Sequence, residues 1–117
     1  MTTIRQATDA DAAAIYAMIN ELALYEKEPD AVTSTEQDVR DHLFGENPSV
    51  FALVADNDGE LEGMALWFLS YSTWEGRHGI WLEDLYVREE CRGRGIGTAL
   101  LQELARIAVK NVSRRVE

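Results

Sequence analysis

The chain has 117 residues, a hydrophobic content of 46% and a formal net charge of −10. This length suits one domain, which we expect to cover residues 1–117. The acidic balance argues against nucleic acid as a partner, and no apolar window is long enough to span a membrane. The only cysteine, Cys91, excludes an internal disulfide and fits the reducing conditions of the cytoplasm.

The N-terminal half predicts one short strand and two helices. Residues 4–7 alternate apolar and polar side chains, as a strand does. Two variants of the capping box, each a threonine followed three residues later by an aspartate, then begin helices. The capping pairs are Thr8 with Asp11 and Thr35 with Asp38. Apolar spacing carries the first helix to about residue 25, and we expect the second to end at Gly45.

The C-terminal half predicts a hairpin, a third strand and a last helix. The expected strands occupy residues 50–55, 61–71 and 79–87, the first two joined by a turn over residues 56–59. A helix over about residues 97–110 follows a glycine-rich segment, and residues 112–117 begin another alternation. This order of elements is typical of a mixed α/β fold.

The third strand carries two adjacent carboxylates, Glu83 and Asp84. Alternation would place Ile80, Leu82, Asp84 and Tyr86 on one face, and Trp81, Glu83, Leu85 and Val87 on the other. The two carboxylates should therefore face opposite sides of the sheet. A simple alternative is that only one of them lines a cleft.

The segment from Arg92 to Thr98 joins this strand to the last helix. Its glycines let the backbone approach a ligand, and the first helical turn offers unpaired N–H groups with partial positive charge. Arg92 and Arg94 add full charges suited to phosphate, so we expect a phosphate-bearing ligand here. A P-loop does not fit, because Thr98 follows Gly97 directly, without the required lysine between them. A dinucleotide fingerprint does not fit either, because it needs glycine or alanine at the position of Thr98.

The remaining pattern, Arg92-x-x-Gly95-x-Gly97, resembles the Gln/Arg-x-x-Gly-x-Gly/Ala loop of the GNAT superfamily of acetyl-CoA-dependent N-acetyltransferases. The similarity covers residues 4–115 and is closest to the spermidine/spermine (diamine) N-acetyltransferase branch. The segments that carry it are Glu21–Glu26, Phe44–Pro48, Tyr71–Arg77 and Leu82–Val87. The resemblance implies a mixed, mainly antiparallel sheet flanked by helices.

The resemblance also implies acetyl-CoA as co-substrate and a small primary amine as acceptor. The main chain of Leu85, Tyr86 and Val87 would pair with the pantetheine arm. The pyrophosphate would be held by Arg92, Gly93, Arg94, Gly95, Ile96, Gly97 and Thr98, and the amine by Tyr25, Glu26, Trp74, Glu83 and Asp84. Glu83 would be the water-mediated general base. We expect no metal site, because His42 and His78 lack ligand spacing.

Two features depart from that branch. Ser72 and Thr73 precede Trp74 where the branch usually carries an aspartate. The loss of that carboxylate weakens the case for a polyamine and admits other small amines, including thialysine-like amino acids or an antibiotic-type amine. The chain ends at Glu117, whereas GNAT domains continue with further elements that include a tyrosine general acid. We therefore expect a partial domain, truncated after the cofactor-loop helix, that forms a homodimer. A CoA-binding or dimerisation fragment without activity, or a plain α/β interaction fragment, are the alternatives.

Overall fold

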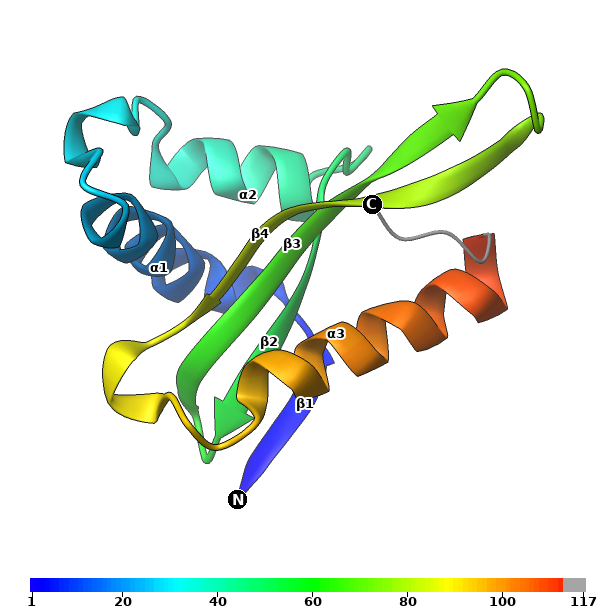
Figure 1. Cartoon of the computed structure of the whole chain (residues 1–117). Helices are drawn as coiled ribbons and strands as arrows, with labels where there is room; N and C mark the ends of the chain where they lie inside the picture. Colours follow the sequence, from blue (N-terminus) through cyan, green and yellow to red (C-terminus); the bar gives the residue numbers. More distant parts are fainter. Residues whose placement is uncertain (113–117) are drawn as a thin grey trace.

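A computed structural model describes residues 1–112 and places four strands in one antiparallel sheet (Figure 1). The strands are β1 (Thr2–Gln6), β2 (Phe51–Asn57), β3 (Glu60–Ser72) and β4 (Arg77–Val87), paired in that order. Helices α1 (Ala12–Tyr25) and α2 (Glu36–Phe44) cover one face, and α3 (Ile96–Ile107) covers the other. The predicted fold, a mainly antiparallel sheet flanked by helices, is confirmed.

Local signals in the sequence account for the ends of these elements. At the start of α2 the Asp38 N–H donates to Thr35 Oγ1 at 3.2 Å, and the Thr35 N–H donates to the Asp38 carboxylate at 2.9 Å. Asp58 and Gly59 take the positive φ values, 52° and 96°, that a tight hairpin turn needs. α3 continues into a π-helical turn, Ala108–Val112, while the strand expected from residue 112 falls on residues 113–117, outside the described part. Within residues 1–112 we find no helix of the length and apolarity that a membrane crossing requires.

Two apolar layers hold the helices on the sheet. The layer between the sheet and helices α1 and α2 contains fully buried side chains that include Ile15, Met18, Val54 and Met64. The layer between the sheet and α3 contains Leu53, Ile80, Leu100 and Leu104. Each such side chain contributes about 1.5–3 kcal/mol when it leaves water. Together the layers fix the C-terminal end of α1 and the N-terminal end of α3 relative to β4.

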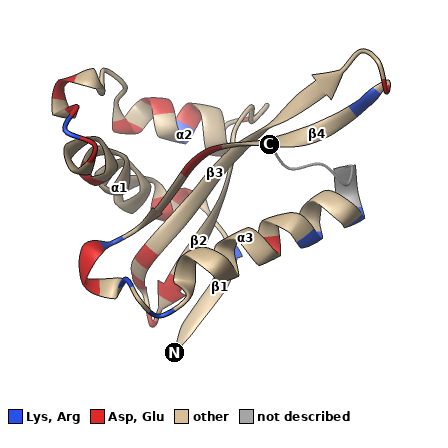
Figure 2. Cartoon of the chain, in the orientation of Figure 1, with Lys and Arg blue, Asp and Glu red and all other residues tan. Residues whose placement is uncertain are grey.

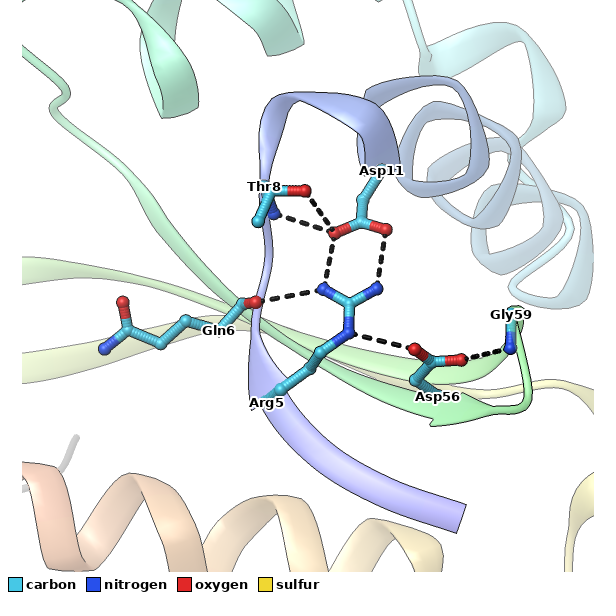
Figure 3. Close-up of polar contacts among 6 residues, drawn as sticks. All are labelled: Arg5, Gln6, Thr8, Asp11, Asp56 and Gly59. Carbon is cyan, nitrogen blue, oxygen red and sulfur yellow. Dashed lines mark hydrogen bonds and ion pairs between the residues drawn. The ribbon is translucent and has the colours of Figure 1, made fainter. Parts of the chain in front are cut away.

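Arg5, near the end of β1, joins three elements through its guanidinium (Figure 3). Nη1 and Nη2 donate to the Asp11 carboxylate at 2.8 and 2.9 Å, and Nε donates to Asp56 at 3.0 Å. Asp11 also accepts the Thr8 N–H, and Asp56 accepts the Gly59 N–H, each at 2.7 Å. The hydrogen bonds from Arg5 hold the pKa of the Asp11 carboxyl below its ordinary value. The start of α1 is thereby tied to β1 and to the β2–β3 turn.

Candidate functional site

β4 lies at one edge of the sheet and contains a β-bulge at Glu83. Leu82 is opposite Trp67 on β3 and Asp84 is opposite Leu66, so Glu83 is an extra residue without its own partner. An extra residue shifts all later side chains to the other face of the strand.

The bulge makes the expected alternation along this strand wrong. Ile80 and Leu82 pack in the layer beneath α3, but Tyr86 packs in the layer beneath α1 and α2. Leu85 and Val87 take its expected place on the α3 side. The sequence pattern predicted one face for Ile80, Leu82 and Tyr86, because period-2 alternation assumes that each residue has one partner.

The bulge also brings both carboxylates of β4 to one hollow, which corrects the expectation that they face opposite sides. This acidic hollow, of about 330 Å³, lies between β4 and the C-terminal end of α1 with its following turn. Its lining consists of Ile19, Leu22, Ala23, Glu26, Glu28, Ala31, Val32, Glu83 and Asp84. The middle of β4 is accordingly acidic in Figure 2, and no lysine or arginine of residues 1–112 lines the hollow.

Electrostatics in the acidic hollow favour a positively charged occupant. Burial raises the pKa of the Asp84 carboxyl, and the charges of Glu83 and Glu26 raise it further. A cation placed among these carboxylates would offset their mutual repulsion and restore the charged form of Asp84. The hollow is therefore suited to an ammonium group on an aliphatic stem, which the apolar lining residues would contact.

A second hollow has a volume of about 360 Å³ and lies beside the C-terminal half of β4; we call it the cofactor slot, after the ligand predicted for this segment. It is lined by Leu22, Tyr25, Leu85, Tyr86, Val87, Arg92 and Gly97. Leu22 lines both the slot and the acidic hollow, so the two are adjacent. The slot is mainly apolar and runs along an edge strand, where main-chain groups are open to a ligand that adds itself to the sheet.

The slot leads to the glycine loop that precedes α3. Gly93 and Gly95 have φ values of 84° and 77°, a left-handed conformation that strains other residues. Gly95 is the residue before α3, and its carbonyl accepts the Ala99 N–H at 3.0 Å. The N–H groups of the first turn of α3 have no carbonyl partner within the helix, which makes this turn suitable for an anion.

The two arginines of the loop point to different places. The Arg92 Nε donates to the Val87 carbonyl at 2.9 Å, and its guanidinium lies 4.4 Å from the Tyr25 ring centre and 5.7 Å from that of Tyr86. Arg94 instead donates from Nη2 to Glu62 on β3 at 2.7 Å. Only Arg92 lines the cofactor slot.

The residues predicted to bind the amine are not all brought together. Glu26, Glu83 and Asp84 line the acidic hollow. Tyr25 lies beneath Arg92 in the cofactor slot, and Trp74, 97% exposed at the tip of the β3–β4 hairpin, lines neither hollow. The roles of Tyr25 and Trp74 in amine binding stay predictions.

Sequence reasoning missed three residues of this region: Leu22, Glu28 and Glu62. Leu22 and Glu28 line the hollows from α1 and the turn after it, and nothing in their local pattern distinguishes them. Glu62 had a signal, because it is the only charged residue in the buried run 61–67. Among residues 1–112, no group of three or more His, Cys, Asp or Glu side chains is arranged to hold a metal ion.

A family model for the GNAT acetyltransferases matches residues 13–117. The chain belongs to the GNAT acetyltransferase family. The similarity to GNAT N-acetyltransferases predicted from the glycine loop is confirmed. Members of this family use acetyl-CoA as acetyl donor, which fits the combination of an edge-strand slot and an anion-binding helix start.

Two curated members of the family show the nearer relationships. Thialysine N-epsilon-acetyltransferase of Sus scrofa is 43% identical over 114 residues, covering 91% of this chain and 66% of that protein. Spermidine/spermine N(1)-acetyltransferase-like protein 1 of Homo sapiens is 37% identical over 113 residues, covering 91% of this chain and 16% of that protein. The chain spans about two thirds of the length of the mammalian thialysine enzymes.

Solved GNAT structures support the fold. An aminoglycoside acetyltransferase from an uncultured soil metagenomic sample, in complex with sisomicin, superposes with a TM-score of 0.82 at 12% identity, covering 99% of this chain and 75% of that one. Ribosomal-protein-alanine N-acetyltransferase from Brucella melitensis superposes with a TM-score of 0.78 at 21% identity, covering 99% and 77%. At these identities the likeness shows the fold alone.

Proposed function

We propose that this protein transfers the acetyl group of acetyl-CoA to a primary amine of a small cationic molecule, of the diamine, polyamine or thialysine-like class. The observation that carries this proposal is the bulge at Glu83, which sets an acidic hollow directly beside the cofactor slot. Similarity to thialysine and spermidine/spermine acetyltransferases supports the same class of acceptor.

The main requirement of the reaction is removal of a proton from the amine. An aliphatic amine has a pKa of about 10.4, so only the minor neutral form attacks at pH 7, at a cost of about 4–5 kcal/mol. In our proposal Glu83, acting through a water, accepts that proton, while Asp84 and Glu26 hold the cation.

The transfer itself then needs no covalent enzyme intermediate. The amine nitrogen forms a bond to the thioester carbonyl carbon and loses its second proton, and the carbon–sulfur bond breaks to release the CoA thiolate, which takes up that proton. A main-chain N–H near Leu85 would polarise the thioester carbonyl as negative charge develops on its oxygen. The Arg92 guanidinium and the first turn of α3 would hold the pyrophosphate.

Thiol release from acetyl-CoA over a panel of diamines, polyamines, thialysine and neutral amines tests the proposal. We expect turnover with the cationic amines, and a fall in kcat of about 10²–10⁴-fold for Glu83→Gln with the Kd for CoA unchanged. Glu46→Gln, at an exposed position outside both hollows, is the control and should keep wild-type kinetics. Absence of turnover with every primary amine would refute the proposed activity, and wild-type kcat in Glu83→Gln would refute the assigned base.

The non-catalytic alternative makes a different prediction for the same protein. A CoA-binding or dimerisation module would bind CoA in isothermal titration but release no thiol with any amine. A homodimer and a cytoplasmic location stay predictions, the first of which light scattering of the purified protein tests directly.

A further inference from the structure

Glu62 on β3 is a buried carboxylate, 7% exposed, that contacts three separate segments of the chain. Its Oε1 accepts the Thr2 hydroxyl of β1 at 2.5 Å. Its Oε2 accepts the Asn57 side-chain amide at 3.1 Å and the Arg94 guanidinium at 2.7 Å. A buried carboxylate is costly unless its oxygens are satisfied, and here all three donors are needed to satisfy them.

The main chain at Glu62 also contacts the segment that follows β4. Asp56 is opposite Leu61 and Ala55 is opposite Gly63, so Glu62 is the extra residue of a second bulge. Its carbonyl accepts the Arg88 N–H at 2.9 Å.

Glu62 therefore contacts both ends of the turn that leads from β4 into the glycine loop. Arg88, whose N–H donates to the Glu62 carbonyl, is the first residue after β4. Arg94, whose guanidinium donates to the Glu62 carboxylate, lies next to Gly95, the residue that precedes α3. A second donation, from Arg94 Nε to the Cys91 carbonyl at 3.4 Å, closes the loop on itself.

These contacts assign Arg94 a different role from Arg92. The Arg94 guanidinium is turned toward β3, whereas Arg92 faces the cofactor slot. The left-handed glycines on either side of Arg94 let the chain bend around this anchored side chain. The anchored side chain thus lies directly before the start of α3.

We propose that Glu62 is a positioning residue for acetyl-CoA, which acts by holding Arg94 and with it the glycine loop in the conformation that receives the pyrophosphate. The inference rests on the proposed acetyl-CoA site. The Thr2 hydroxyl and the Arg94 guanidinium hold the pKa of the Glu62 carboxyl at about 2, so this residue stays charged at any pH at which the protein would work.

The sign of the expected effect separates positioning from simple charge. CoA is a polyanion, so removing a negative charge near its phosphates would by itself strengthen binding. Loss of a loop-positioning contact would weaken it. For Glu62→Gln we expect the Kd for CoA to rise about tenfold, the loss typical of one hydrogen bond to a charged group.

The test is a double-mutant cycle measured by isothermal titration with CoA, on Glu62→Gln, Arg94→Gln and the double variant. If Glu62 acts through Arg94, the double variant should bind no more weakly than the weaker single variant. Arg94→Lys, which keeps the charge, should restore part of the affinity lost in Arg94→Gln. Glu60→Gln is the matched control, because Glu60 lies on the same strand, is exposed and makes no side-chain hydrogen bond or ion pair within the described part of the chain.

Two further readouts distinguish positioning from a loss of stability. Hydrogen exchange without ligand should be faster at the amides of residues 92–97 in Glu62→Gln, with the core of the sheet still protected. In steady-state kinetics the KM for acetyl-CoA should rise while the KM for the amine stays constant. Wild-type CoA affinity in Glu62→Gln, or additive losses of CoA affinity in the double variant, would overturn the role of Glu62 but leave the proposed acetyl-CoA site in place. Absence of CoA binding by the wild-type protein would overturn the proposed acetyl-CoA site as well.

Discussion

Replacing Arg5 with methionine would test how far the packing of α1 depends on one ion-pair cluster (Figure 3). Methionine preserves most of the aliphatic stem but removes the donations to Asp11 and Asp56. The Asp11 side chain is 9% exposed and would keep its hydrogen bond from the Thr8 N–H, but would lose its cationic partner.

The size of the effect follows from this partial burial. Removing one member of a fully buried pair costs about 3–5 kcal/mol. Arg5 is 34% exposed, so water would reach the remaining carboxylate, and we expect a loss of about 2–3 kcal/mol. For a domain of this size about 4 °C of Tm corresponds to each kcal/mol, which predicts a fall in Tm of roughly 8–12 °C.

Thermal unfolding followed by circular dichroism measures this loss, with Arg40→Met as control. Arg40 also pairs with two carboxylates, Asp9 and Glu36, but both are well exposed, so its loss should leave Tm close to the wild-type value. Because the native pKa of Asp11 is lowered from 3.8, its contribution is present above pH 4 and is lost as the pH falls through the native pKa. The Tm difference between wild type and Arg5→Met should narrow in that acid range. Equal Tm losses in the Arg5 and Arg40 variants would refute the reasoning from burial.

Two further predictions concern β4 and its neighbour. Asp84→Asn should raise Tm at pH 7, because the native pKa of this carboxyl is raised and its charged form therefore destabilises the fold. The gain in Tm should vanish below about pH 3.8, the ordinary pKa of an aspartate, where the carboxyl is protonated in both the folded and the unfolded chain. The KM of the same variant for a cationic amine should rise about tenfold. A lower Tm for Asp84→Asn at pH 7 would contradict this. Gly63→Ala should lose about 1–3 kcal/mol of stability, since the new Cβ would lie 2.8 Å from the Tyr86 carbonyl oxygen, whereas Gly97→Ala, with its nearest atom at 3.7 Å, should not. Chemical denaturation measures the free energy of unfolding of Gly63→Ala and Gly97→Ala. Equal values for the two variants would contradict the prediction, because they would mean that β3 and β4 can move apart around the new Cβ without loss of stability.

The order of the elements and the glycine loop could be predicted from the sequence because their signals are local. Thr35 and Asp38 specify the start of α2 within four residues, and Asp58-Gly59 specifies a tight turn within two. The strand, glycine loop and helix start are likewise consecutive, so one short segment was enough to indicate an anion site. Each of these features depends on neighbours in the sequence and needs no knowledge of the tertiary structure.

The shape of the site could not be predicted because it depends on pairing between distant residues. The bulge at Glu83 exists only in the register between β3 and β4, and no pattern within residues 79–87 reveals it. Arg94, unlike Arg92, pairs with Glu62, which precedes Arg94 by 32 residues. The pattern placed Glu83 and Asp84 on opposite sides of the sheet because it assumed regular alternation, whereas both line the acidic hollow.

The bulge in β4 has a consequence for how this protein tolerates genetic change. Substitutions at Glu83 alter one side chain, whereas deletion of its codon would remove the unpaired residue and leave Leu85, Tyr86 and Val87 opposite the same β3 partners and on the same faces. Tyr86 would then stay in the layer beneath α1, but the acidic hollow would lose one of its carboxylates. We therefore expect a one-residue deletion at Glu83 to change the charge of the acidic hollow while the core packing of β4 is retained.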